Sequence, residues 1–216
     1  MGAYLCIFPD NVYFNTADQT DYGYVHARFQ SVGAVTYTPC NLNGEAYEDV
    51  EVSSSEPAEP ANGQYWMDSS SGTHVLKQYS SSSAMWVEIP TVYTKISCDG
   101  IGAAFKQYDG VTISGVKYAA DDEAMIQQLN ALNTTTVIRN MGDNYIIVVG
   151  ILDEQYTQTA GKVVVTRDVP KMDYVCELNN RLWGCSSAKH EVYCCKLGDP
   201  KNWNTLGTGA ADAWAA

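Results

Sequence analysis

The sequence predicts a mainly β protein built from antiparallel β-hairpins. Tyrosine and tryptophan, which favour strands, occur 15 and 5 times. Short apolar runs alternate with clusters of the turn-forming residues Asn, Asp, Gly, Pro and Ser. Only one segment, residues 121–132, has the pattern of a helix. Hydrophobic residues make up 45% of the 216-residue chain, which is enough to build a core.

The first predicted element is a hairpin. "AYLCIFPDNVYFNTAD" contains two apolar runs around Pro9, Asp10 and Asn11, and Asp and Asn tolerate left-handed turn conformations. "HARFQSVGAVTYTPCNLN" predicts a further strand. The acidic stretch "NGEAYEDVEVSSSEPAEP" follows, and we expect a solvated surface loop there. The alternative, a carboxylate metal site, lacks the spacing of a calcium-binding loop.

Two hairpin segments resemble each other. Residues 64–89 contain two strand-like runs around a Ser/Gly turn, then an all-serine turn and a tryptophan. The tryptophans and histidines recur at nearly the same spacing in two sets: Trp66, His74, Trp86, and Trp183, His190, Trp203. Repeated hairpins that end in an aromatic residue are typical of β-propeller blades, so a partial propeller-like sheet is expected.

The tryptophans are also the candidate contact residues. Exposed aromatic side chains stack on sugars and anchor protein interfaces. We expect Trp66 and Trp183 in the core, and we treat Trp86, Trp203 and Trp214 as candidate interface or stacking aromatics.

A different unit separates the two hairpin segments. "DGVTISGVKY" (Asp109–Tyr118) predicts a strand, and "DDEAMIQQLNAL" (Asp121–Leu132) predicts a helix with an acidic start. "TTTVIRN", "NYIIVVGIL" and "KVVVTRD" predict three more strands, whereas "NTLGTGAADAWAA" closes no recognisable element. We therefore expect three regions: an N-terminal hairpin region, a small α+β insert, and the incomplete start of a second hairpin region, over residues 1–95, 96–168 and 169–216.

A cysteine-rich stretch raises the question of a metal or thiol site. Cys185, His190, Cys194 and Cys195 fall within "RLWGCSSAKHEVYCC". Zinc ligands usually come in C-x₂₋₄-C pairs, and adjacent strand residues point to opposite faces, so Cys194 and Cys195 cannot both face one metal from a regular strand. A packed hairpin with structural cysteines is favoured, and a metal site or a reactive thiol is the alternative.

The sequence marks no catalytic centre. A Ser or Cys nucleophile needs a histidine base, and the chain has three histidines but no G-x-S-x-G, H-E-x-x-H or P-loop motif. The acidic pairs Asp121/Asp122 and Asp153/Glu154 leave a glycosidase couple as an alternative. We expect no enzymatic activity, no cofactor and no metal.

Charge and hydropathy exclude several partners. The net charge of −12 opposes binding to nucleic acid. No apolar run approaches the about 20 residues that a membrane helix needs, and the longest, Tyr145–Leu152, suits a buried strand. The N-terminus lacks the pattern of a signal peptide, so the seven cysteines are expected to be reduced in a cytoplasmic protein.

One long segment resembles a known family. "MDYVCELNNRLWGCSSAKHEVYCCKLGDPKNWN" (Met172–Asn204) resembles a stretch in virion structural proteins of tailed bacteriophages, where an "NNRLWG" strand leads to an "EVYASKLGDPKNWN"-like strand and turn. "IFPDNVYFNT" (Ile7–Thr16) is similar to their first hairpin. "DGVTISGV" and "LNALNTTTVI" (Leu129–Ile138) are similar to the barrel-like insert of phage tail proteins. The resemblance is close over Met172–Asn204 and loose before about Gly63.

The resemblance implies a non-enzymatic structural component of a virion. Such a protein belongs to the head–tail connector, tail hub or nozzle, is assembled in the bacterial cytoplasm, and contacts other virion proteins or its own copies in a ring. Family chains continue past the "NWN" turn, whereas this chain ends 12 residues after Asn204, so an incomplete propeller is expected. Its unpaired C-terminal strands would then seek partners. The alternatives are a glycan- or receptor-binding tail module and a glycan hydrolase.

Overall fold

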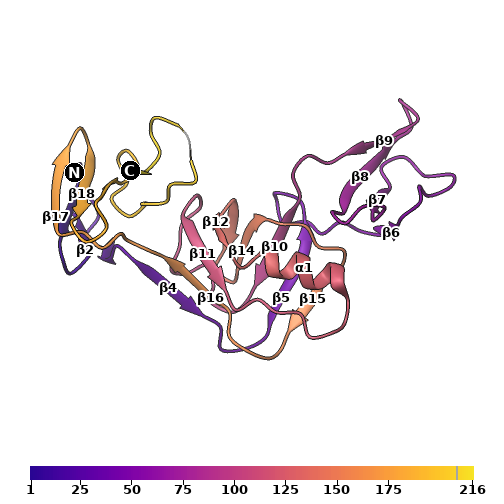
Figure 1. The fold of residues 1–216 in the computed structure, drawn as a ribbon, viewed down its shortest axis with the longest axis horizontal. Coiled ribbons are helices and arrows are strands. Elements are labelled where there is room, and N and C mark those ends of the chain that lie inside the picture. The colour runs from indigo at the N-terminus through magenta and orange to yellow at the C-terminus, as the bar shows by residue number, and fades with distance from the viewer. Residues whose placement is uncertain (208) are drawn as a thin grey trace.

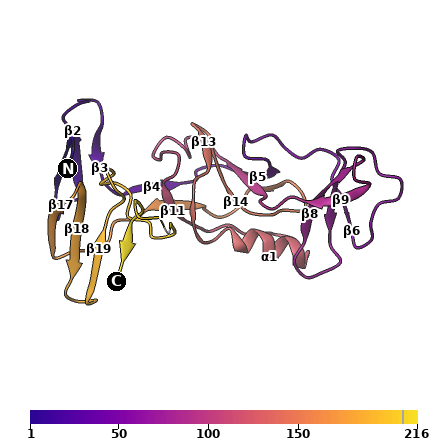
Figure 2. The same cartoon turned by 90° about the horizontal axis from the view of Figure 1, so that it is seen from above.

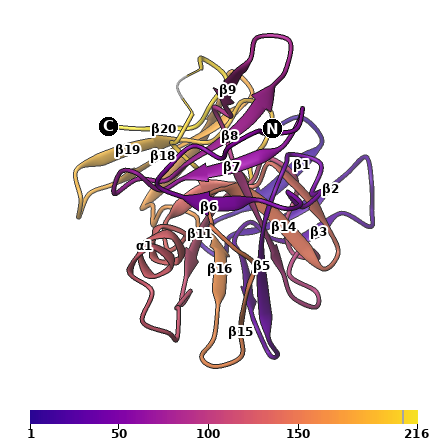
Figure 3. The ribbon, with the colours of Figure 1, turned by 90° about the vertical axis from the view of Figure 1, so that its right-hand side faces the viewer.

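Three lobes lie in a row along the molecule (Figures 1 and 2). The computed structural model describes residues 1–207 and 209–216. Both chain ends lie in one lobe, here called the terminal lobe; a central lobe contains the helix, and a distal lobe forms the opposite end. Figure 3 views the molecule end-on from the distal lobe.

The protein is mainly β, with several antiparallel sheets and one short helix. Among the described residues the sheets close neither a barrel nor a propeller. None of the helical residues that the structure describes forms a span long and apolar enough to cross a membrane.

The terminal lobe consists of two sheets packed face to face. One has the order β1-β2-β3 and the other β17-β18-β19-β20. Their bounds are β1 Tyr4–Ile7, β2 Val12–Asn15, β3 Tyr22–Tyr24, β17 Tyr174–Leu178, β18 Arg181–Ser186, β19 Glu191–Cys194 and β20 Trp214–Ala215. The inner faces share one core that includes Tyr13, Leu182, Tyr193 and Trp203.

Local turn chemistry explains the hairpins of this lobe. Asn11 has a φ of 55°, which confirms the expected left-handed turn between β1 and β2. Asn179 and Asn180 have φ values of 54° and 56°, the conformation of the two-residue turns that match strand twist, and they join β17 to β18. The hairpin predicted over 181–195 is confirmed as β18 and β19.

Two larger sheets and the helix enclose the central core. The sheets have the orders β13-β14-β10-β5-β15 and β12-β11-β16-β4. The bounds are β4 Ala27–Gln30, β5 Val35–Cys40, β10 Tyr93–Ser97, β11 Gly110–Ser114, α1 Glu123–Ala131, β12 Thr135–Val137, β13 Asn140–Gly142, β14 Tyr145–Val149, β15 Tyr156–Gln158 and β16 Val164–Arg167. The predicted helix is confirmed: Asp122 caps it by accepting from the Met125 amide at 3.0 Å, and Met125 and Leu129 are buried.

The distal lobe is a four-stranded sheet with the order β6-β7-β8-β9. Its strands are β6 Glu51–Ser53, β7 Tyr65–Asp68, β8 Val75–Ser80 and β9 Met85–Glu88, so the hairpins expected over 64–89 are confirmed. β6 pairs with β7 in parallel and lies in the acidic stretch where only a loop was expected. The acidic side chains of that stretch are all exposed, as expected.

Strand pairing joins segments that are distant in the sequence. β5 pairs with both β10 and β15, and β4 pairs with β16, while β1–β3 pack against β17–β20. The sheets therefore group residues on both sides of the expected boundary at 95/96. The regions 1–95, 96–168 and 169–216 remain a prediction about separate folding units.

Candidate interface on the terminal lobe

The outer face of β1–β3 carries six apolar side chains and no charged one. Strand register aligns them in two rows, Leu5–Phe14–Tyr22 and Ile7–Val12–Tyr24, because directly paired residues point to the same face of a sheet. Five of the six are exposed, up to 68% for Tyr22. We call these six residues the first outer face.

The outer face of β17–β20 is also apolar and aromatic. Its rows are Tyr174–Cys185–Val192 and Cys176–Trp183–Cys194–Trp214, and these seven residues form the second outer face. Trp183 and Trp214 flank Cys194, with their rings edge to face at 5.8 Å between centroids. Tyr174 is 76% exposed and Trp214 47%.

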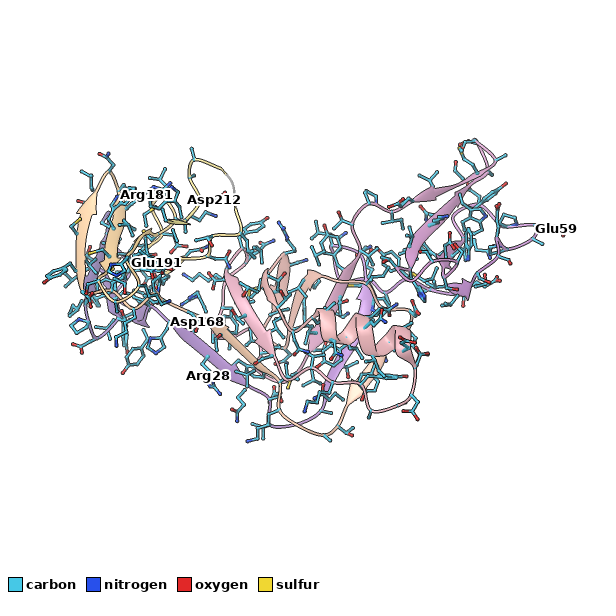
Figure 4. All side chains as sticks on the ribbon, in the orientation of Figure 1. Arg28, Glu59, Asp168, Arg181, Glu191 and Asp212 are labelled. Atoms are coloured by element: carbon cyan, nitrogen blue, oxygen red, sulfur yellow. The ribbon has the colours of Figure 1, made fainter. Side chains whose placement is uncertain are left out.

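Arg181 fixes the C-terminal segment beside the second outer face. Its guanidinium donates to the carbonyl oxygens of Cys195, Ala210 and Asp212 at 2.6, 2.5 and 2.8 Å. Figure 4 shows Arg181 and Asp212 close together in this lobe. A cavity of about 610 Å³ lies between this segment and the two tryptophans, Trp183 and Trp214.

The candidate aromatics fall in different environments. Trp214 is exposed on the second outer face, but Trp203 is only 6% exposed and donates its indole N–H to the Pro200 carbonyl at 2.8 Å, so it lies in the core rather than on a contact surface. Trp86 is half-buried on β9 and meets Trp66 edge to face at 5.4 Å. Trp66 is buried as expected, whereas the expectation that Trp183 lies in the core is wrong, because that side chain is half-buried on the sheet's outer face.

The cysteine-rich stretch packs as part of the hairpin. Cys194 lies between tryptophans on the outer face, whereas Cys195 contacts the lobe core, where its sulfur accepts from the Leu182 amide at 3.1 Å. Burial raises the pKa of the Cys195 thiol to about 11, so it stays protonated at neutral pH. Over residues 1–207 and 209–216, no three His, Cys, Asp or Glu side chains form a group that could hold a metal ion.

A charged cluster that the sequence did not reveal ties the two sheets together. Asp21, at the start of β3, accepts from Tyr13 Oη at 2.8 Å, Asn15 Nδ2 at 3.1 Å and Lys201 Nζ at 3.3 Å. Lys201 Nζ also lies 4.3 Å from the centroid of the Tyr13 ring.

The pKa values of this cluster follow from its contacts. Burial opposes ionisation of Asp21, but the hydrogen bonds from Tyr13 and Asn15, together with the charges of Lys201 and Lys106, hold its pKa below the ordinary value. Burial and the hydrogen bond to Asp21 raise the pKa of Tyr13 to about 12. Burial and the neighbouring Lys106 lower the pKa of Lys201. Asp21 is therefore a carboxylate at neutral pH.

A second polar cluster lies between the central and distal lobes. His74 Nδ1 is 2.8 Å from Asp153 Oδ1. Gln128 on α1 donates to the same carboxylate at 2.8 Å and accepts from the Asp153 amide at 2.9 Å. Asp153, one of the carboxylates considered for glycosidase chemistry, is thus engaged in fixing His74, and Asp122 of the other acidic pair caps the helix.

The sequence carries one signal for the outer faces. Leu5 and Ile7, Val12 and Phe14, and Tyr22 and Tyr24 alternate with inward residues at the strand period of two, so each strand has an outward side without a charged residue.

The comparisons with known proteins returned nothing: no family model, no curated protein and no solved structure matches the chain.

Proposed function

We propose that this chain is a non-enzymatic structural component of a tailed-phage virion, placed in the head–tail junction or the tail and acting through protein–protein interfaces. The observation that carries the proposal is the terminal lobe, in which two stacked sheets have apolar outer faces as well as an apolar core. Exposed apolar patches of this kind mark interaction sites. The segment that resembles virion proteins, Met172–Asn204, supplies β17, β18 and β19 of this lobe.

We also propose how the lobes correspond to a propeller-like sheet and a barrel-like insert. β1–β3 and β17–β20 stack as neighbouring blades of a propeller do, so we interpret the terminal lobe as part of a propeller-like arrangement. The central lobe, with two sheets and a helix around one core, is interpreted as the barrel-like insert. Other virion proteins or further copies of the chain would be the partners, and the bacterial cytoplasm the place of assembly.

Peptide mass spectrometry on purified phage particles from induced cells of the source tests the proposal. We expect peptides of this chain in a fixed ratio to the portal protein, and that ratio would give the symmetry of the ring. Peptides found in the lysate but missing from purified particles would contradict a structural role and favour an assembly factor or an enzyme.

The cavity beside Trp183 and Trp214 favours a second candidate, a glycan- or receptor-binding tail module. Exposed indole rings stack on sugars, and Trp214 is 47% exposed at the cavity wall. Titration with host-surface glycans should then shift the tryptophan fluorescence of the wild type and of Trp86→Phe, but not of Trp214→Phe. No shift in the wild type would remove this candidate.

A further inference from the structure

We propose that two copies of this chain stack head to tail through their terminal lobes, with the first outer face of one copy packed on the second outer face of the next. The inference rests on the proposed structural function and deepens it, because it names the two surfaces and the partner. The outer faces lie on opposite sides of the lobe, since the inner faces of both sheets meet in its core.

The proposed contact between copies resembles the contact between the two sheets inside the terminal lobe. Within one chain, β1–β3 already pack on β17–β20 through Cys6 and Tyr13 on one side and Leu182 and Tyr193 on the other. The same two sheets present apolar rows on their outer sides, with cross-strand spacing set by the same registers. Packing one outer face on the other therefore continues the alternation of sheets with the same chemistry.

The charge distribution favours a second copy of the chain over a charged partner. The chain carries a net charge of −12, so two copies repel each other except where uncharged surfaces meet. The first outer face has no charged side chain. The two rows of the second have none, and the third row on that side of the sheet, Leu178–Arg181, carries Arg181, whose guanidinium is buried against carbonyl oxygens.

The available area is sufficient for a concentration-dependent contact. Aromatic side chains bury about 150–250 Å² each. At about 200 Å² for each ring, the exposed fractions of Tyr22 and Tyr24 leave roughly 250 Å² on the first face, and those of Tyr174 and Trp214 leave roughly 250 Å² on the second. The rings alone therefore supply roughly 500 Å², and exposed aliphatic side chains such as Leu5, Ile7 and Val192 add to it, which places the contact among weak, transient interfaces. Because each copy has both faces, the contact is heterologous and builds rings or open stacks rather than closed dimers.

The test uses the full-length chain and three double variants. Leu5→Glu with Tyr22→Glu blocks the first outer face, and Tyr174→Glu with Val192→Glu blocks the second. Met85→Glu with Val87→Glu is the matched control, because these side chains are exposed on a strand of the distal lobe, at 56% and 49%. Near-ultraviolet circular dichroism and thermal melts first establish that each variant is folded.

Sedimentation velocity from about 5 to 500 μM then separates the outcomes, over the range where a contact of this size associates. The wild type and the control should associate, and more strongly at higher salt, because screening reduces the repulsion between acidic copies. Each blocked variant alone should stay monomeric, while an equal mixture of the two should form a one-to-one dimer and stop there.

Other results overturn the proposal. Wild type that stays monomeric at the highest concentration, or a blocked variant that dimerises on its own, rules out head-to-tail stacking. A chain that is present in particles but monomeric in solution leaves the structural role standing and removes this inference. A chain that stacks in solution but is absent from particles would leave the stacking standing and remove the structural role in the virion.

Discussion

Lys201 and Asp21 are 180 positions apart in the sequence, yet their Nζ and Oδ1 atoms lie 3.3 Å apart. The contact joins the turn after β19 to the start of β3, and hence the two sheets of the terminal lobe. The Lys201 side chain is only 5% exposed. The hydrogen bonds of Asp21 therefore compensate for burying a lysine at the site where the first and last parts of the chain meet.

Replacing Asp21 should destabilise the terminal lobe strongly. Asp21→Ala leaves Lys201 buried without its carboxylate and removes the partner of Tyr13, so we expect a loss of about 2–4 kcal/mol in the free energy of unfolding, measured by urea titration. Lys189→Ala is the control, because its 4.0 Å contact with Glu191 is exposed and should contribute less than about 1 kcal/mol. Equal effects of the two variants would contradict the proposed role of the cluster.

The same cluster predicts a loss of stability in acid. Because folding lowers the pKa of Asp21, its contribution is fully present above the unfolded value of about 3.9 and is lost as the pH falls through the lower folded value. The melting temperature should therefore drop below about pH 4. Asp21→Asn should be less stable than the wild type at pH 7, and its melting temperature should fall less on acidification. Parallel pH curves for the two proteins would show that Asp21 does not carry this dependence.

A buried ion pair within the central lobe holds an arginine that also contacts the terminal lobe. Arg167 donates from Nη1 to Asp109 Oδ2 at 2.5 Å and from Nε to the Val25 carbonyl at 3.1 Å. Arg167→Met leaves a buried carboxylate unpaired and should cost about 3–5 kcal/mol in urea unfolding. Arg167→Met combined with Asp109→Leu should be more stable than Arg167→Met alone, because no uncompensated charge remains. A double variant that is less stable than the single one would contradict this account.

The elements that the sequence predicted well are those with local signals. The Asp122 cap, the apolar positions of α1 and the Asn11 turn are each set by residues within a few positions of one another. β20 was missed, since Trp214–Ala215 is short, lies among small residues and forms a strand only by pairing with β19. Because β20 was missed, the tryptophan spacing in the sequence made Trp203 the equivalent of Trp86. In the structure Trp86 lies on the fourth strand of the distal sheet, and the tryptophan on the fourth strand of the β17–β20 sheet is Trp214.

Long-range pairing had no such signal. Tyr37 Oη donates to Gln158 Oε1 across 121 positions, and nothing near either residue indicates the partner. The candidate interface was only partly predictable for the same reason. Trp214 was identified by its residue type, but the rows Leu5–Phe14–Tyr22 and Ile7–Val12–Tyr24 exist only once the strand registers are known.

Thiol reactivity should differ sharply among the cysteines. Cys176 is exposed on β17, while Cys40 and Cys195 are buried and burial raises the pKa of each thiol to about 11. We expect Ellman's reagent to label Cys176 first in the native protein and the two buried thiols only after unfolding. Cys176→Ser should remove the fast phase, and Cys195→Ser should leave it unchanged. A fast phase that survives Cys176→Ser would mean that another thiol is accessible.

The His74–Asp153 contact should hold the distal lobe against the central one. His74 precedes β8, whereas Asp153 and Gln128 belong to the central lobe, so Asp153→Ala removes the contact with His74 across this junction and the contact with Gln128 within the central lobe. We expect faster hydrogen exchange at the start of β8 and in the second half of α1, and a stability loss of about 1–2 kcal/mol. The neighbouring Glu154 is exposed, and Glu154→Ala is the matched control.

The pattern of exchange identifies what the contact does. If Asp153 serves as a junction between lobes, the change stays confined to this region and the terminal lobe exchanges as in the wild type, because its core shares no residue with the distal cluster. Unchanged exchange at β8 and α1 in Asp153→Ala would mean that the apolar contacts of Val92 and Ile151 with the distal sheet hold the lobes together without the histidine. The two outcomes decide whether the distal lobe is positioned by the polar contact of His74 or by the apolar contacts of Val92 and Ile151.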